Sequence, residues 1–384
     1  MKEKNFLYGK DDELLFLFNK VTEIEDQRIK EFERFVKSLP LYSPEELFKL
    51  LEKEGYRGQI EARKMVCVAI YRHLKRIKMI YENRITPELL PEKVNYIFIG
   101  PTGSGKTYIV ELLFGKILRI PYVIIDITKY SETGYVGENV INIPYKLIEA
   151  ARGNKYLAQI GAVIIDEFDK IAGSPSNLRF AGAGTQKDVS GYGVQRELLK
   201  LLEHKIFEYG EDHNVEGRIN TREILFIALG SFTGFIREIE RDNIGFLKEI
   251  DENENIIAYK LKGQEEDLNN FLKYGFLPEL IARFQRIIPF EALDKNTLKD
   301  ILDLKLEKLI NEFKLEGFDL VLTEKVKDLM VQKALKKGTG ARGIESELLK
   351  ELEKVAFKIF GKNKKGKVII NSNKDKIESK IIFK

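Results

Sequence analysis

The pattern of apolar and polar residues changes twice along the chain. Up to about residue 40, apolar side chains recur at steps of three and four among charged ones, as in an amphipathic helix. The next segment, SLPLYSPEELFKLLEKEG, marks a boundary, because Pro40 and Pro44 interrupt the pattern and Ser43 with Glu46 forms a capping box at the start of a new helix. We therefore predict a short helical N-terminal segment over residues 1–42.

From about residue 94, short apolar runs alternate with helical patterns. The runs are VNYIFIG, PYVIIDI, AVIID, EILFIALG and RIIPF. Strands with so little polar alternation are buried on both faces, which is typical of a parallel sheet with helices on either side. We predict a large α/β domain over residues 43–291, with one strand of a parallel sheet for each run.

Beyond Leu293 the pattern is helical again, through LKDILDLKLEKLINEF and ESELLKELEKVAFKIF. A lysine-rich turn, GKNKKGK, then separates two strand-like runs, VII and KIIF. Lysines at this position fit the solvated tip of a hairpin, and a nucleic-acid contact is the alternative. Residues 292–384 are thus expected to form a smaller, mostly helical domain that ends in a short β-hairpin.

The composition excludes several classes of protein. Among 384 residues, 64 basic and 60 acidic side chains give a net charge of +4, which does not indicate nucleic-acid binding. Cys67 is the single cysteine, so an intrachain disulfide and a cysteine zinc site are excluded. No apolar run is long enough to cross a bilayer, and acidic residues precede the apolar patch of the N-terminus, unlike in a secretory signal. We expect a cytoplasmic protein that binds neither membrane nor nucleic acid.

The first apolar run ends in the phosphate-loop sequence GPTGSGKT. It comprises Gly100, Pro101, Thr102, Gly103, Ser104, Gly105, Lys106 and Thr107. Glycines let the backbone aim amide N–H groups at a phosphate, and the following helix adds its positive end. Lys106 supplies a charge for the outer phosphates, and Thr107 offers a hydroxyl to Mg²⁺. A chance glycine-rich turn is the alternative, but the strand before it and the helix after it favour a site for ATP and Mg²⁺.

A pair of acidic residues ends a later apolar run, GAVIIDEFDK. Asp166 suits the magnesium shell, and Glu167 suits a base that orients and deprotonates the attacking water. A solvated acidic turn is the alternative. Because the phosphate loop lies upstream and the glutamate directly follows the aspartate, we predict ATP hydrolysis.

With these motifs, the sequence from about Gly55 to the C-terminus resembles the AAA+ ATPases, and within them the ClpX-type protein unfoldases. The resemblance implies a P-loop AAA+ domain with a parallel five-stranded sheet between helices, followed by a small domain. The stretch GYRGQIEARKM resembles the family segment that packs over the adenine. That resemblance implies nucleotide-binding roles for Tyr56, Gly58, Gln59 and Ile60. Arg57 departs from the small aliphatic residue usual in the family.

Two stretches between these motifs resemble the loops that line the pore of the family's ring. One is Gly134, Tyr135, Val136 and Gly137, in which the aromatic residue is implied to grip a polypeptide. A tyrosine offers a large rigid surface, and flanking glycines let it move. The other is GSPSNLRFAGAGTQ, followed by the family-like stretch KDVSGYGVQRELLKLLE. Taken alone, the first stretch is a tight turn and the second a disordered linker.

Three polar residues resemble the family's catalytic positions. Ser231 stands at the end of EILFIALGSF, where a polar side chain senses the γ-phosphate, although asparagine or threonine is more usual there. Arg283 in FLPELIARF matches the arginine finger that reaches the nucleotide of the neighbouring subunit, and such fingers are worth about a thousandfold or more in rate. Arg342 in GTGARGIE matches the sensor-2 arginine of the small domain.

Ile244, Gly245 and Phe246 spell the tripeptide with which ClpX-like rings dock onto the ClpP peptidase. An apolar tip among charges fits a partner's pocket, and several tips in one ring add avidity. A strand that packs locally is the alternative. The N-terminus differs from the family, whose chains begin with a zinc-binding domain held by cysteines, so we expect a divergent member.

Taken together, the resemblance implies an ATP-dependent protein unfoldase and translocase. It would be the regulatory ATPase of a Clp-type protease, a homo-oligomeric and hexameric ring that threads unfolded or tagged proteins through its pore. Two alternatives stay open. One is an ATPase that remodels protein complexes without a peptidase, and the other is a nucleotide-gated scaffold with little turnover.

Overall fold

The computed structural model describes residues 5–131, 138–173, 191–203, 206–209, 217–233, 268–362, 364–373 and 376–383. Three predictions fall outside the described residues. These are the first pore loop at residues 134–137, nearly all of the second pore segment at 173–186, and the docking tripeptide at 244–246. Among the helices of the described ranges, none has the length and apolar character that a membrane crossing requires.

A five-stranded parallel sheet forms the centre of the large domain, in the order β2-β5-β8-β1-β9. The strands are β1 (Tyr96–Ile99), β2 (Tyr122–Asp126), β5 (Ala162–Asp166), β8 (Leu225–Gly230) and β9 (Arg286–Pro289). Each comes from one of the apolar runs, and the side chains of β1 and β8 are buried throughout. The predicted parallel five-stranded sheet is confirmed.

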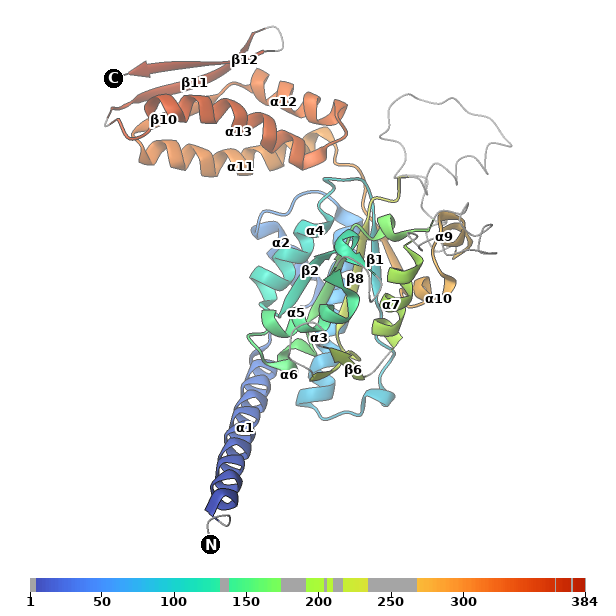
Figure 1. Ribbon diagram of the computed structural model, residues 1–384. Coiled ribbons are helices and arrows are strands. Elements are labelled where there is room, and N and C mark those ends of the chain that lie inside the picture. The colour runs from blue at the N-terminus through green and yellow to red at the C-terminus, as the bar shows by residue number, and fades with distance from the viewer. Residues whose placement is uncertain are drawn as a thin grey trace, which may run out of the picture.

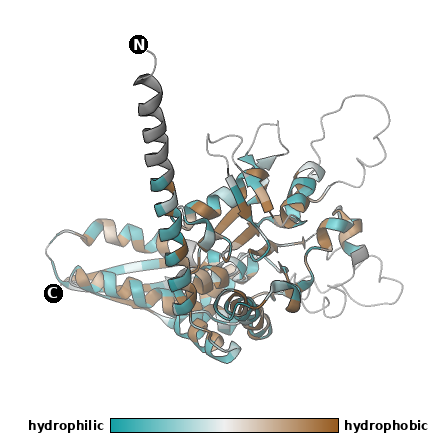
Figure 2. Ribbon diagram, turned by 90° about the horizontal axis from the view of Figure 1, so that it is seen from below, coloured by the Kyte–Doolittle hydropathy of each residue, from teal (hydrophilic) through white to brown (hydrophobic). Residues whose placement is uncertain are grey.

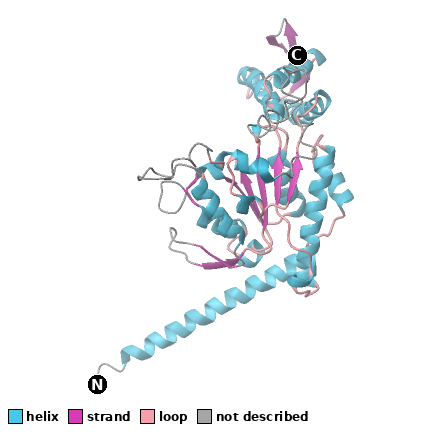
Figure 3. Cartoon of the chain, turned by 90° about the vertical axis from the view of Figure 1, so that its right-hand side faces the viewer, coloured by secondary structure: helices cyan, strands magenta, loops and turns pink. Residues whose placement is uncertain are grey.

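Helices cover both faces of this sheet (Figure 3). One face packs on α2 (Pro44–Lys53), α3 (Ile60–Ile77) and α4 (Lys106–Val110), which continues as the π-helix η3 (Glu111–Leu118). The other face packs on α5 (Ile143–Ala150), α7 (Tyr192–Glu203), α9 (Leu268–Tyr274) and α10 (Pro278–Ile281). Alternate residues of each strand enter the two cores, as with Ile97 on one face and Phe98 on the other. Figure 2 shows the apolar colour gathered on the strands inside the domain.

Short elements complete the large domain. They are η1 (Lys78–Glu82), η2 (Pro87–Leu89), β3 (Tyr130–Ser131), β4 (Glu138–Asn139), η4 (Ile127–Lys129), η5 (Val140–Asn142), α6 (Lys155–Ala158), η6 (Phe168–Ile171), β6 (Ile206–Tyr209) and β7 (Gly217–Asn220).

The N-terminal helix α1 (Asn5–Ser38) runs away from the large domain, with the N-terminus at its far tip (Figure 1). Its last turns are attached, since Phe32 and Val36 are buried and the Phe32 ring meets Tyr81 edge to face at 4.9 Å. The chain then turns at Pro40 and restarts at Ser43, whose hydroxyl accepts from the amide of Glu46 at 3.2 Å. The Glu46 carboxylate accepts from the amide of Ser43 at 2.7 Å, so the predicted capping box is present.

The C-terminal part of the chain forms a smaller body beside the large domain (Figure 1). It contains α11 (Lys295–Leu315), β10 (Phe318–Leu322), α12 (Glu324–Lys336), α13 (Gly340–Ile359), β11 (Gly366–Asn373) and β12 (Lys376–Phe383). Strands β11 and β12 pair as the expected antiparallel hairpin. Strand β10, which was not predicted, pairs in parallel with β11 and makes the sheet three-stranded. With this small domain and the sheet above, the predicted fold class is confirmed.

Candidate active site

The phosphate loop joins the carboxyl end of β1 to α4. Gly103 and Gly105 adopt left-handed φ angles of 78° and 97°, which glycine reaches without a steric penalty. Lys106 is buried and folds back over the loop, where its Nζ donates to the carbonyl of Gly100 at 2.5 Å and of Pro101 at 3.0 Å. The Ser104 hydroxyl is buried and has no hydrogen-bond partner among the described residues. The loop is therefore preformed, with polar groups ready for a phosphate.

Burial changes the acidity of Lys106. Removal from water disfavours its charged form and lowers its pKa to about 8. The negative charges of Asp166, Asp169 and Glu167 oppose this, and the positive charge of Arg342 adds to it. Because charge effects of this kind act over short distances, the phosphate-loop lysine, the acidic turn and the small-domain arginine share one site.

The acidic strand end lies directly beside the loop. Thr107 donates through Oγ1 to Oδ2 of Asp166 at 3.2 Å, and the amide of Glu167 donates to Oδ1 of Asp166 at 2.9 Å. A hydroxyl and a carboxylate at this spacing fit a magnesium ion, which prefers oxygen ligands. Glu167 has a φ of 57° and an exposed side chain, so its carboxylate meets solvent at the mouth of the site.

Ser231 follows β8 and is held by a buried acid, Asp169. Its amide donates to Oδ1 of Asp169 at 3.2 Å, and its hydroxyl donates to Oδ2 at 3.0 Å. The Asp169 carboxylate also accepts from Nζ of Lys170 at 2.9 Å. A serine hydroxyl has one proton and two lone pairs. With its proton directed to Asp169, the Ser231 oxygen can accept a hydrogen bond from a water at the site.

The residues that resemble an adenine-binding segment have mixed surroundings. Gln59 has a φ of 52°, and its Nε2 donates to the carbonyls of Ser104 at 3.2 Å and Glu291 at 2.5 Å. Its Oε1 accepts from the amide of Glu291 at 2.9 Å. Gln59 thus hydrogen-bonds both to the phosphate loop and to Glu291, which follows β9, and holds these two segments together. Ile60 is 57% exposed and is an apolar surface on which a base can rest.

Tyr56 lies under the phosphate loop. Only 2% of it is exposed, and its hydroxyl donates to the carbonyl of Gly105 at 3.3 Å. The ring of Tyr108, which is 45% exposed, stacks on Tyr56 with the centroids 6.0 Å apart and 16° between the planes. Tyr56 therefore supports the loop from below, and Tyr108 is the accessible aromatic of the pair.

The small domain touches the phosphate loop through close backbone contacts. A Cβ at Gly103 would lie 2.5 Å from the carbonyl oxygen of Thr339, and the amide of Ala341 donates to the carbonyl of Gly103 at 3.4 Å. A Cβ at Gly58 would lie 2.7 Å from Cγ2 of Thr297 on α11. Arg342 stands exposed in the first turn of α13, close to Lys106. The structure thus brings Arg342 to the site together with the loop and the acidic turn.

Arg283 lies elsewhere. It follows α10, pairs with Glu203 at the end of α7, and its carbonyl accepts from Nδ2 of Asn95 at 3.0 Å. Asn95 precedes β1, whereas the phosphate loop begins at Gly100 after β1, so Asn95 and Gly100 are about 16 Å apart at ~3.3 Å per residue. The Arg283 side chain is 45% exposed. Of the predicted catalytic residues in the described ranges, Arg283 is the one that does not reach its own phosphate loop.

Comparisons with known proteins agree with this geometry. A family model described as an AAA domain (Cdc48 subfamily) matches residues 91–287, and one described as the C-terminal, D2-small domain, of ClpB protein matches residues 293–370. The ATP-dependent Clp protease ATP-binding subunit ClpX of Borrelia duttonii is 35% identical over 350 residues, which are 87% of this chain and 78% of that protein. The protein of the same name from Borrelia recurrentis matches equally. ClpX 3 of Methylococcus capsulatus is 36% identical over 329 residues, 79% of this chain and 73% of that protein.

The chain belongs to the ClpX family of AAA+ ATPases. The predicted resemblance is confirmed, and so is the prediction that the chain is an ATP hydrolase. The family implies nucleotide binding, and in this chain Thr107 and Asp166 are hydrogen-bonded to each other beside Lys106.

Two acidic residues were not predicted from the sequence, one beside the phosphate loop and one beside Arg283. Asp169 follows Asp166 by three residues, which on the turn η6 points its side chain back toward the end of β8. Its presence in the run DEFDK was a signal, but the partner Ser231 lies 62 residues away. Glu203, the partner of Arg283, lies 80 residues from it and has no local signal in the sequence.

Proposed function

We propose that the chain is the ATP-driven protein unfoldase and translocase of a Clp-type protease, acting as a hexameric homo-oligomeric ring. The observation that carries the proposal is the separation of Arg283 from its own phosphate loop by the length of β1. A finger at that position can complete a site only on another subunit, so hydrolysis requires assembly. The printed name of the relatives, ATP-dependent Clp protease ATP-binding subunit, supports the protease context.

Within one site, each group has a chemical role. The loop amides and Lys106 hold the phosphates, since a charged donor binds phosphate oxygens more strongly than a neutral one. Thr107 and Asp166 would hold Mg²⁺, which neutralises charge on the phosphates. Glu167 orients and deprotonates the attacking water, and the oxygen of Ser231 accepts from the same water. Arg283 of the neighbouring subunit neutralises the charge that develops on the transferred phosphoryl group.

Hydrolysis moves the small domain through its contact with the phosphate loop. The loop meets the start of α13 at Gly103 and Ala341, and Arg342 in the same turn lies close enough for its charge to act on Lys106. Loss of the γ-phosphate removes the attraction for Arg342, which changes the angle between the two domains. In a ring, this rotation displaces Tyr135 along the pore and pulls a threaded polypeptide. Ile244, Gly245 and Phe246 are proposed to hold a ClpP-type peptidase at the exit.

Unfolding of a stable fluorescent protein that bears an unstructured tail tests this proposal. Tyr135→Ala should abolish ATP-dependent loss of fluorescence while ATP hydrolysis continues, because the grip on the substrate is lost and the site is intact. Tyr135→Phe is the matched control, since it keeps the ring, and it should unfold the substrate at close to the normal rate. If Tyr135→Ala unfolds the substrate as fast as the unaltered protein, the pore assignment is wrong.

A further inference from the structure

Gln195 is a fully buried polar side chain that joins three segments of the large domain. It lies in the first turn of α7 and has no measurable exposure. Its Nε2 donates to the carbonyls of Ile171 at 2.7 Å and Gly275 at 3.1 Å, and its Oε1 accepts from the amide of Leu277 at 2.7 Å. A primary amide has two protons and one carbonyl oxygen, so each of its polar atoms has a partner here.

The segments that Gln195 joins belong to two different nucleotide sites. Ile171 ends the turn η6, which carries Asp169 and directly follows Glu167. Gly275 and Leu277 directly precede α10, the short helix that leads to Arg283. The first segment therefore belongs to the subunit's own site, and the second carries the finger proposed for the neighbouring subunit's site.

The two segments also touch each other closely. The amide of Gly173 donates to the carbonyl of Gly275 at 2.8 Å. A Cβ at Gly275, whose φ is 112°, would lie 1.9 Å from the carbonyl oxygen of Gly173. The backbones have no room for a side chain at that point, so movement of one segment is passed to the other.

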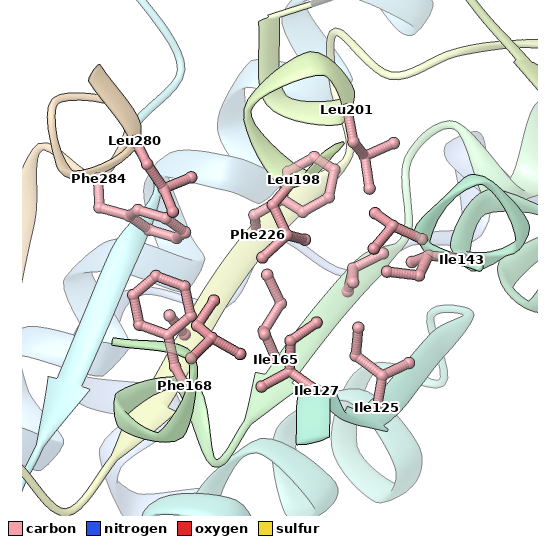
Figure 4. Close-up of a cluster of buried hydrophobic side chains, with 14 of the residues drawn as sticks. Ile125, Ile127, Ile143, Ile165, Phe168, Leu198, Leu201, Phe226, Leu280 and Phe284 are labelled. Carbon is pink, nitrogen blue, oxygen red and sulfur yellow. The ribbon is translucent and has the colours of Figure 1, made fainter. Parts of the chain in front are cut away.

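An apolar layer reinforces this connection. Phe168, next to Glu167, stacks on Phe276 with the ring centroids 4.9 Å apart and contacts Phe284 at 5.4 Å. Phe284 directly follows Arg283 in the sequence. Figure 4 shows Phe168 and Phe284 in the same cluster as Leu280 of α10 and Leu198 of α7.

Gln195 holds the residue at which helix α10 begins. Its N-cap residue is Leu277, and the side chain at that position makes no cap hydrogen bond within the described part of the chain. The backbone amide of Leu277 instead donates to Gln195. An apolar residue in place of Gln195 would leave this amide and the carbonyl of Ile171 without the Gln195 hydrogen bonds, while the carbonyl of Gly275 would keep only the amide of Gly173, so the segment would have to shift to reach water.

We infer that Gln195 is a positioning residue for Arg283, which it orients by tying the start of α10 to the acidic turn of the same subunit. This inference rests on the proposed action of Arg283 on the neighbouring nucleotide. In this arrangement, a change at one acidic turn moves the finger that serves the next site, and the movement links hydrolysis at successive sites. The expected loss is large, because a misplacement of about 1 Å at a reacting centre can reduce the rate on the order of a hundredfold.

Mixed rings test the inference. Donor subunits carry Glu167→Gln, so they cannot hydrolyse ATP at their own site but still have Arg283. Acceptor subunits carry Arg283→Ala, so they have an intact site of their own but cannot supply the arginine finger to a neighbour. ATP hydrolysis by the mixture then comes from acceptor sites whose arginine finger is supplied by a neighbouring donor subunit. Gln195→Met is introduced into the donor or into the acceptor, and Lys200→Met on the exposed side of the same helix is the matched control.

We expect Gln195→Met in the donor to reduce hydrolysis by the mixture at least about tenfold, and the same substitution in the acceptor to reduce it less than about threefold. Lys200→Met should have no effect in either subunit. Equal losses in donor and acceptor, or no loss in the donor, would overturn the positioning role. If the mixture without Gln195→Met is already inactive, the finger does not act between subunits, and the proposed function fails together with this inference.

Discussion

Lys106 illustrates how burial prepares a single residue for phosphate. Its ammonium group is removed from water and satisfied by two carbonyl oxygens, which are weaker partners than a phosphate. The bound phosphates stabilise the charged form, so the pKa of Lys106, about 8 in the free protein, rises on ATP binding. A group whose pKa is higher in the complex takes up a proton on binding, and this makes the affinity depend on pH.

The affinity for ATP should therefore fall as the pH rises above 8, approaching about tenfold per pH unit. The measurement is titration of Mg-ATP into the hydrolysis-silent Glu167→Gln variant between about pH 7 and pH 9.5, where the ATP charge no longer changes. Lys106→Arg is the control, because arginine stays charged throughout this range and should give weaker but pH-independent binding. An affinity of the Glu167→Gln protein that stays constant over the range would contradict this interpretation of Lys106.

Asp169 orients Ser231, and its charge is needed for that role. An asparagine of the same shape offers one acceptor oxygen in place of two, and its amide protons oppose the donors of Ser231. Asp169→Asn should lower kcat for ATP hydrolysis by about tenfold or more, with a smaller rise in KM because the charge of Asp169 also acts on Lys106. Asp303→Asn, which removes a surface partner of Lys327, should leave both parameters unchanged. A normal kcat for Asp169→Asn would show that Ser231 needs no such support.

Among the elements, the close contact between the phosphate loop and the start of α13 is made by Gly103 and Gly340, where a Cβ on Gly340 would lie 2.7 Å from the carbonyl oxygen of Gly103. Gly103→Ala places a Cβ against the carbonyl of Thr339, at a left-handed φ that costs about 1–2 kcal/mol for a residue with a side chain. Gly361 is the matched control, because its φ is 72° and no described atom lies within 4 Å of a Cβ there. Both alanine variants should have a lower free energy of unfolding, because alanine is strained at a left-handed φ angle. Urea unfolding measures this loss.

The two variants should differ in activity. Gly103→Ala should also reduce ATP hydrolysis, since it separates the small domain from the loop, whereas Gly361→Ala should hydrolyse ATP normally. Equal activities would mean that the contact between Gly103 and α13 has no part in turnover.

The elements also show which features a sequence predicts. The strands of the sheet and the phosphate loop are local, because a run of apolar residues or a fixed spacing of glycines defines each of them. Strand β10 was missed because only five residues, FDLVL, alternate between buried and exposed positions. The pairing of Ser231 with Asp169, and that of Gln195 with Gly275 and Leu277, depend on how distant segments fold together. No local pattern in the sequence reveals these partners.

In the whole molecule, the nucleotide site and the proposed arginine finger lie apart from each other, and this separation underlies the proposed function. The phosphate loop, the acidic turn and Arg342 meet at the carboxyl ends of the strands, while Arg283 and Glu203 are exposed near the amino end of β1. In the proposed function, such a subunit is incomplete by itself and completes the site of its neighbour, so a closed ring would satisfy every site. The proposed ring would place the pore loop of each subunit around one axis, which suits work on a long polymer.

The most direct test of the account is ATP hydrolysis by the purified protein, with and without an unfolded protein added. We predict hydrolysis that rises with subunit concentration and increases further when the unfolded protein is present, because a threaded chain engages the loops that move with the small domain. The Glu167→Gln variant should bind ATP and show no hydrolysis under either condition. Tight ATP binding with negligible turnover, unchanged by unfolded protein, would contradict the account and favour a nucleotide-gated scaffold.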